Sequence, residues 1–199
     1  MTEVLVLASG SPVRARLLAA AGLQFRVDPA AIDEESLKGE CQRRREGGIE
    51  CALALAEAKA RYVASGHDRA LVIGADQILV CGDQWFDKPA HPGEARRQLE
   101  TLRGRTHELT TAVCVFQGAS RLWHTVSQPR LTMRDFSNGF LDEYLAAEGA
   151  AVLNSVGGYR LEGMGVQLFD RVEGDYFTIL GLPLLDLLSF LRLRGEVPS

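Results

Sequence analysis

A long apolar run near the middle of the chain constrains the fold more than any other feature. Residues 70–81 read ALVIGADQILVC, a pattern that predicts a buried strand. Residues 49–64, just before it, are rich in alanine with helical spacing, and residues 92–102, just after it, begin with proline and also have helical spacing. A buried strand between two helices predicts an α/β fold.

Strand and helix patterns alternate along the rest of the chain as well. Further strands are expected at 4–8, 25–28, 108–116, 121–126, 130–133, 166–169 and 175–179, and after the turn GDQW. Further helices are expected at 12–21, 137–147 and 184–194. Residues 33–48 are highly charged and predict a mobile loop, with a short helix within it as the alternative, beside a site. The expected class is α/β with a mixed sheet and two lobes around a cleft.

Composition narrows the function classes. The 199 residues carry a net charge of −4, which argues against a general nucleic-acid binder. The N-terminus does not resemble a signal peptide, and no apolar run is long enough to span a membrane. The four cysteines and four histidines are scattered without zinc spacing, so we expect reduced thiols in a cytoplasmic protein.

The first turn, Ser9-Gly-Ser-Pro, lies between a strand and a helix. Ser11 can cap the helix, and Pro12 suits its first position. The helix start would direct free N–H groups at the turn, where Ser9, Ser11 and Arg14 add donors suited to a phosphate chain. A well-capped helix with a solvated arginine explains the same residues, and both interpretations stay open here.

Asp76 is the best single candidate for a catalytic base or metal ligand. It lies in a buried strand, where a carboxylate is costly unless it binds a metal, a cation or hydrogen-bond donors. The alternative is an aspartate that caps a turn. The acidic residues 33–35 could complete a magnesium or manganese site with it, or form a solvated loop. Lys59 and Lys88, taken alone, fit surface lysines.

Taken together, these stretches resemble the Maf family of nucleotide pyrophosphatases. The resemblance runs from LASGSPVRARLL to GLPLLDLL and includes AIDEES, AEAKA, VIGADQ, DKP, LRGRTHELTTAV, GGYRLEGMG and DYFTILGLPL. It implies a single domain over residues 1–199, with an elongated mixed sheet flanked by helices and a nucleotide-binding cleft between two lobes. The implied activity is hydrolysis of a nucleoside triphosphate to the monophosphate and pyrophosphate with Mg²⁺ or Mn²⁺.

The resemblance also implies roles for particular residues. Asp76 would accept the proton and, with Glu34, bind the metal, while Lys59 and Lys88 would offset charge on the leaving pyrophosphate. Ser9, Ser11 and Arg14 would bind the phosphates. Family resemblance further suggests a homodimer.

Several positions depart from the family's commonest form and bear on substrate choice. Val13 replaces the first of two arginines, Gln77 a threonine, Glu162 a glutamine, and Ser155 a lysine. We count Val13, Gln77 and Glu162 among the substrate-binding positions. Gln77 with Glu162 resembles the branch that acts on 7-methyl-GTP, whose base is positively charged. Pairing of Glu162 with Arg160 or solvent is the alternative.

Two other function classes compete with this prediction. A non-catalytic nucleotide-binding regulator of cell division is favoured only by the loss of the late lysine at position 155. A nucleic-acid-processing enzyme is disfavoured by the acidic balance.

Overall fold

The computed structural model describes residues 4–198, which form two compact units. Unit 1 comprises the chain up to Gln77, Thr111–Ser127, and the chain from Asp175 onward; unit 2 comprises Ile78–Thr110 and Gln128–Gly174. Strands β3 (Leu71–Cys81) and β5 (Thr106–Gln117) pass from one unit into the other. The expectation of a single domain over the whole chain therefore stays a prediction.

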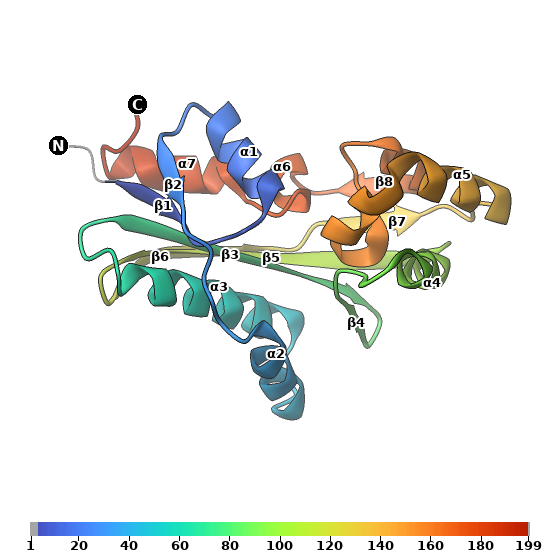
Figure 1. Cartoon of the computed structure of the whole chain (residues 1–199), viewed down its shortest axis with the longest axis horizontal. Helices are drawn as coiled ribbons and strands as arrows, with labels where there is room; N and C mark the ends of the chain where they lie inside the picture. The colour runs from blue at the N-terminus through green and yellow to red at the C-terminus, as the bar shows by residue number, and fades with distance from the viewer. Residues whose placement is uncertain (1–3, 199) are drawn as a thin grey trace. The chain divides into compact units, whose positions relative to one another are not determined.

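The described residues form an eight-stranded mixed sheet, which confirms the expected class (Figure 1). Its order is β2-β1-β3-β5-β7-β8, with β4 beside β3 and β6 beside β5. Strand β1 is parallel to β2 and β3, whereas β4, β6, β7 and β8 pair antiparallel with their neighbours. The remaining strands are β1 (Leu5–Leu7), β2 (Phe25–Val27), β4 (Gln84–Phe86), β6 (Ser120–Ser127), β7 (Arg130–Met133) and β8 (Phe169–Glu173).

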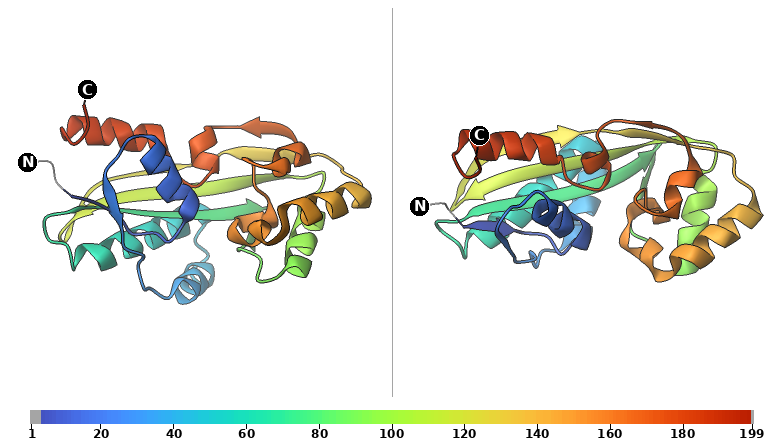
Figure 2. Two further views of the ribbon diagram at one scale, coloured as in Figure 1. Left: turned by 45° about the horizontal axis from the view of Figure 1, so that its top comes forward. Right: turned by 90° about the horizontal axis from the view of Figure 1, so that it is seen from above.

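Helices cover both faces of the sheet in unit 1. Figures 1 and 2 show α1 (Pro12–Ala20) and α7 (Leu184–Leu193) on one face and α3 (Gly48–Ala64) on the other. Side chains alternate along β3, so Ile73 and Ala75 join the core under α1 and α7, while Gly74 and Asp76 face α3. Alternation thus brings Asp76 to the helix that carries Lys59.

Gly74 lets α3 lie unusually close to β3. A Cβ atom at this position would stand 2.2 Å from the Ala56 carbonyl oxygen and 2.7 Å from the Ala60 Cβ. The alanine-rich face of α3 supplies the matching small surface, because Ala56 and Ala60 are both fully buried. Because the helix lies so close to the strand, a side chain from α3 can reach a residue on β3.

Unit 2 packs two helices and a series of short 3₁₀ turns beside its strands. The helices are α4 (Pro92–Leu102) and α5 (Asn138–Glu148), and Ser137 caps α5 as expected. The turns are Gly149–Asn154, Val156–Gly158 and Met164–Leu168. In the unit's core, His107 Nε2 lies 2.8 Å from the Tyr159 hydroxyl, and both rings contact Phe169.

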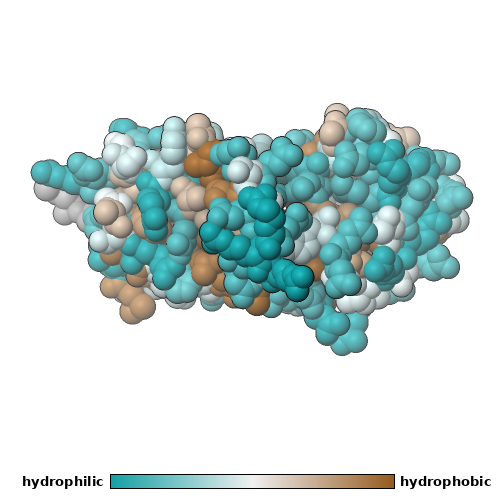
Figure 3. All heavy atoms as spheres, turned by 90° about the horizontal axis from the view of Figure 1, so that it is seen from below, coloured by the Kyte–Doolittle hydropathy of each residue, from teal (hydrophilic) through white to brown (hydrophobic). Residues whose placement is uncertain are grey.

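The charged stretch at residues 33–48 is mostly helical, as the alternative of a short helix within the expected loop allows. It forms helix α2 (Glu34–Arg43), whose N-cap Asp33 accepts a hydrogen bond from the Ser36 amide at 2.9 Å. Acidic residues in the first turn and Arg43 in the last suit the helix dipole, which explains why so polar a segment is helical. Its outer surface is strongly hydrophilic (Figure 3).

The strands expected at 166–169 and 175–179 are wrong. Residues 164–168 form a 3₁₀ turn, and the strand β8 follows it at Phe169–Glu173. Residues Tyr176–Ile179 form the single-turn helix α6, because Asp175 accepts hydrogen bonds from both the amide and the hydroxyl of Thr178. Within residues 4–198, no helix combines the length and apolar character that crossing a membrane requires.

Candidate active site

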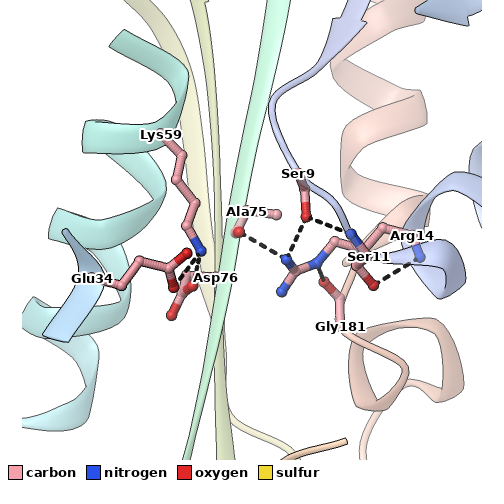
Figure 4. Close-up of polar contacts among 8 residues, drawn as sticks. All are labelled: Ser9, Ser11, Arg14, Glu34, Lys59, Ala75, Asp76 and Gly181. Carbon is pink, nitrogen blue, oxygen red and sulfur yellow. Dashed lines mark hydrogen bonds and ion pairs between the residues drawn. The ribbon is translucent and has the colours of Figure 1, made fainter. Parts of the chain in front are cut away.

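A buried ion pair between Asp76 and Lys59 forms the centre of the candidate site. Lys59 Nζ lies 2.6 Å from Asp76 Oδ1 and 2.8 Å from Glu34 Oε2 (Figure 4). Asp76 is only 5% exposed and Lys59 only 7%. The structure therefore brings together three of the predicted catalytic residues, from β3, α3 and the first turn of α2.

The position of Lys59 contradicts the alternative of a surface lysine. Its neighbours on α3, at one-turn spacing, are buried residues such as Leu55 and Val63, so its side chain leaves the helix toward the sheet. Gly74 shortens that path by letting the helix approach. The ammonium group has three N–H donors, and two of them are directed at carboxylates.

Asp76 keeps one oxygen free of partners. Within the described residues, its Oδ2 is buried and accepts no hydrogen bond, although Oδ1 is paired with Lys59. A buried carboxylate oxygen without a donor is costly, and proteins keep such atoms mainly where a ligand or reaction uses them. The side chain of Glu34 is 44% exposed, so its second oxygen can also meet solvent or a ligand.

These two carboxylates could contribute only part of a metal's ligands. Among residues 4–198, no group of three or more histidine, cysteine, aspartate or glutamate side chains gathers as a metal centre would. Magnesium and manganese commonly take one or two carboxylates and complete their shell with water and substrate phosphates. The oxygen-only donor set and the unpartnered Asp76 Oδ2 fit such an ion.

The turn between β1 and α1 presents hydroxyl groups and a helix N-terminus. Ser11 is the N-cap of α1, and its Oγ accepts from the Arg14 amide at 3.4 Å. The Ser11 amide in turn donates to Ser9 Oγ at 3.3 Å. Val13, next to them on α1, is half-buried and packs against the hydrophobic core.

Arg14 is buried rather than solvated. Its Nε donates to the Gly181 carbonyl at 2.8 Å, and its Nη1 donates to Ser9 Oγ at 3.0 Å and to the Ala75 carbonyl at 2.9 Å (Figure 4). Burial lowers the pKa of the Arg14 guanidinium, while the nearby charges of Asp76 and Glu34 raise it. The interpretation of Arg14 as a solvated arginine is therefore wrong.

Gln77 lies on the opposite face of β3 from Asp76 and has a fixed orientation. Its Nε2 donates to Thr111 Oγ1 at 2.8 Å and to the Thr178 and Ile179 carbonyls at 3.1 and 3.2 Å. Carbonyl oxygens can only accept, so the amide nitrogen must be the atom that faces them. The other polar atom of the Gln77 amide, Oε1, can only accept a hydrogen bond.

Two predicted site residues, Lys88 and Glu162, belong to unit 2. Lys88 is exposed on the loop after β4, and Gln98 Nε2 holds the neighbouring Asp87 carbonyl at 3.1 Å. Glu162 Oε1 lies 3.4 Å from Arg160 Nη2, and Arg160 also binds Glu148 at 2.7 Å. The pairing of Glu162 with Arg160, named above as the alternative to base recognition, is therefore present in the structure.

Sequence reasoning missed the acceptors that hold Arg14 and Gln77. Ala75, Gly181, Thr178 and Ile179 contribute backbone carbonyls, and a sequence gives no signal for these groups. The cysteines offer no competing nucleophile, because all four are buried free thiols. Burial raises the pKa of Cys114, for example, to about 12.

Comparison with known proteins finds one family model and several similar proteins that are named as pyrophosphatases. Residues 4–194 match the family model described as Maf-like protein. A nucleoside triphosphate pyrophosphatase from Paramagnetospirillum magneticum is 54% identical over 96% of this chain and 99% of its own length. A 7-methyl-GTP pyrophosphatase from Rhizobium meliloti is 47% identical over the whole of both chains. A solved dITP/XTP pyrophosphatase from Mycobacterium abscessus aligns over 98% of this chain and 97% of its own, with 12% identity and a TM-score of 0.41, a likeness too slight to support an argument.

Proposed function

Because the chain belongs to the Maf family, we propose that it hydrolyses a nucleoside triphosphate to the nucleoside monophosphate and pyrophosphate. Full-length relatives from both named groups, nucleoside triphosphate pyrophosphatases and 7-methyl-GTP pyrophosphatases, support this activity. The observation that carries the proposal is the Lys59–Asp76 pair, in which one buried carboxylate oxygen is held and the other is left without a partner. Such a carboxylate is oriented for chemistry.

Asp76 Oδ2 is the proposed acceptor of the water proton. Water attacks the α-phosphorus, its oxygen forms the new P–O bond, and the bond from phosphorus to the α,β-bridging oxygen breaks. Pyrophosphate leaves with that oxygen, and the water proton passes toward Asp76. The ammonium of Lys59 fixes Oδ1 and compensates the buried charge, so that Asp76 stays in place during the transfer.

The β1–α1 turn is the proposed phosphate-binding element. The N-terminus of α1 and the hydroxyls of Ser9 and Ser11 offer donors to phosphate oxygens. Asp76 and Glu34 are the residues that would hold Mg²⁺ or Mn²⁺, in accord with the unpartnered Oδ2 and the oxygen-only donor set. With an ion on Oδ2, Asp76 would act by orienting the attacking water instead of taking its proton on that atom. When bound, the ion would withdraw charge from the phosphates and make water more acidic.

Substrate choice is proposed to favour 7-methyl-GTP. The Gln77 amide offers only its Oε1 acceptor, which suits a base edge that carries N–H donors. Glu162 is proposed to recognise the positively charged methylated base, and Lys88 to offset charge on the leaving pyrophosphate. In unit 2 the Arg160 pair holds Glu162 without removing its charge.

Pyrophosphate release by the purified protein tests the proposal. We expect metal-dependent release with 7-methyl-GTP that exceeds release with UTP and dTTP, and its loss in Asp76→Asn. Asp83→Asn is the matched control, since Asp83 is exposed on the β3–β4 turn and should leave the rate unchanged. Equal rates for Asp76→Asn and the wild type would overturn the role of Asp76, and faster pyrimidine turnover would overturn the substrate preference.

The same experiment distinguishes the proposed enzyme from a non-catalytic regulator. A regulator would bind nucleotide without releasing pyrophosphate, and Asp76→Asn would not weaken that binding. The buried Asp76–Lys59 pair favours the enzyme, because a binding protein has no need of a desolvated, half-partnered carboxylate.

We also propose a cytoplasmic homodimer that does not bind nucleic acid. Four free buried thiols are typical of a reducing compartment. Large exposed apolar side chains in unit 1, including Leu185 and Tyr176, support self-association. Light scattering during size-exclusion chromatography should give twice the chain mass, and a single chain mass would contradict the dimer.

A further inference from the structure

We propose that Arg14 is a positioning residue that makes the Ser9 hydroxyl an obligatory hydrogen-bond donor toward the substrate phosphates. The proposal rests on the function proposed above and deepens it. Arg14 was expected to be a phosphate ligand, but its side chain is buried and its Nε and Nη1 donate to protein atoms, so only Nη2 remains for direct contact with a ligand.

The bonding of Ser9 Oγ fixes what this hydroxyl can do. A hydroxyl has two acceptor lone pairs and one hydrogen to donate. Arg14 Nη1, at 3.0 Å, and the Ser11 amide, at 3.3 Å, both donate to Ser9 Oγ and so occupy both lone pairs. In the hydrogen bonds found among residues 4–198, Ser9 Oγ takes part only as an acceptor, so its own hydrogen remains to be donated. Ser9 can therefore only donate, and the acceptor it suits is an anionic oxygen.

The charge of Arg14 also strengthens that donor. A hydroxyl that accepts from a guanidinium becomes a better donor, because hydrogen bonds in a chain polarise one another. Ser9 is buried, so water does not screen this effect strongly. The positive charge of Arg14 thus strengthens the hydrogen bond that Ser9 can donate to an anionic ligand.

The guanidinium is itself held in one orientation. Of its five N–H groups, the one on Nε and both on Nη1 are used by Gly181, Ala75 and Ser9. The Ala75 carbonyl belongs to the residue before Asp76, so the same fork ties the phosphate-binding turn to the strand that carries the proposed base. Gly181, at φ +99°, presents the third acceptor from a backbone conformation that favours glycine.

A double-mutant cycle on Ser9 and Arg14 tests the proposal. The variants are Ser9→Ala, Arg14→Lys and the double variant, measured by kcat/KM for pyrophosphate release with 7-methyl-GTP. We expect each single change to lower kcat/KM by about 10- to 100-fold, the cost of losing one charge-assisted donor. If Arg14 acts through Ser9, Arg14→Lys costs less than about threefold once Ser9→Ala is present.

The double-mutant cycle can also contradict the proposal. An independent phosphate ligand at Arg14 would give the same fold-loss with and without Ser9→Ala, within about threefold, and that result would overturn the proposal. The cycle is repeated on the Kd of an α,β-methylene analogue of 7-methyl-GTP. This second readout needs no turnover, so an inactive wild type refutes the proposed function while the binding cycle still decides the role of Arg14.

A backbone variant tests the clamp without changing any charged group. Gly181→Ala strains the φ +99° conformation next to Arg14 Nε, and Gly22→Ala is its control, because Gly22 has φ +78° and open space around it. We expect kcat/KM to fall at least about tenfold in Gly181→Ala and to stay near wild type in Gly22→Ala, with both variants folded by circular dichroism. Equal activity of the two variants would contradict the positioning role.

Discussion

At the scale of single residues, the site depends on charges that are buried in pairs. Lys59 is desolvated on the apolar face of α3, and Asp76 is desolvated in β3, so each makes the burial of the other tolerable. Removing one member leaves an uncompensated charge, which costs far more than the pair contributes as a whole.

This reasoning predicts that Lys59→Met is strongly destabilising. We expect the free energy of unfolding at neutral pH to fall by about 3 kcal/mol, since the buried Asp76 loses the cation that is paired directly with it. Urea unfolding followed by tryptophan fluorescence measures the change. Adding Asp76→Asn to the variant should restore part of the loss, and a further loss of the same size would show that the two charges are not coupled.

His107 predicts a dependence of stability on pH. Burial lowers the pKa of His107 to about 4, from an ordinary value near 6.5 in the unfolded chain. The unfolded state therefore binds the proton first, and the free energy of unfolding falls as the pH drops from about 6.5 to about 4, by about 3 kcal/mol. Above pH 7 this residue contributes no pH dependence.

His107→Gln isolates that contribution. Glutamine keeps a polar partner for the Tyr159 hydroxyl but does not titrate. Urea unfolding at pH 7, 5.5 and 4.5 should show a smaller loss of stability for the variant than for the wild type. Parallel curves for the two proteins would mean that His107 is not the titrating group.

Residue identities in the site could largely be predicted from the sequence, but their partners could not. A carboxylate in an apolar strand, as at Asp76, indicates a functional role, because burying its charge costs free energy. Lys59 by itself fits a surface residue, and only the close approach of α3 at Gly74 shows that it is buried. The role of Arg14 depends on carbonyl groups far along the chain, such as that of Gly181, which no local pattern reveals.

At the scale of elements, the site depends on how closely α3 approaches β3. Gly74 and the alanines of α3 let the helix and strand backbones lie close together, with only the small Ala60 Cβ and backbone atoms at the contact. That contact brings the helix within reach of Asp76, so the packing and the proposed catalytic pair depend on the same glycine.

Gly74→Ala should therefore damage both stability and activity. Its Cβ would overlap the Ala56 carbonyl at 2.2 Å, and we expect a loss of about 2 kcal/mol or more in the free energy of unfolding. Gly66→Ala is the control, because its Cβ would meet nothing closer than 3.7 Å. Urea unfolding and pyrophosphate release measure both effects. A Gly74→Ala protein as stable and active as the control would refute the close-approach argument.

Elements with a strong hydrophobic periodicity could be predicted from the sequence, and helices that depend on a single capping residue could not. The buried strand β3 and the capped helices α1, α4 and α5 have the expected type and nearly the expected bounds. Helix α2 and the turn α6 depend on single aspartate caps, Asp33 and Asp175, whose effect exceeds that of the surrounding composition. The strand β8 has mostly exposed side chains, so it lacks an apolar pattern, and the apolar residues just before it predict a strand where the structure has a 3₁₀ turn.

At the scale of the whole molecule, net charge does not attract the proposed substrate. The chain carries −4, and a nucleoside triphosphate is also an anion. Under the proposed function, binding therefore comes from local donors, which the β1–α1 turn offers, and from the metal ion proposed at the carboxylates. The family, and with it the α/β class, could be inferred from ordered motifs along nearly the whole sequence, because such motifs reflect the fold as a unit.

Hydrolysis in water enriched with oxygen-18 tests the central claim most directly, namely that water attacks the α-phosphorus. The products of 7-methyl-GTP hydrolysis would be separated, and their masses would be measured by mass spectrometry. The account predicts one heavy oxygen in the nucleoside monophosphate and none in the pyrophosphate. Label in the pyrophosphate would place the attack at the β-phosphorus, and label in inorganic phosphate would place it at the γ-phosphorus; either result would contradict the mechanism built on Asp76.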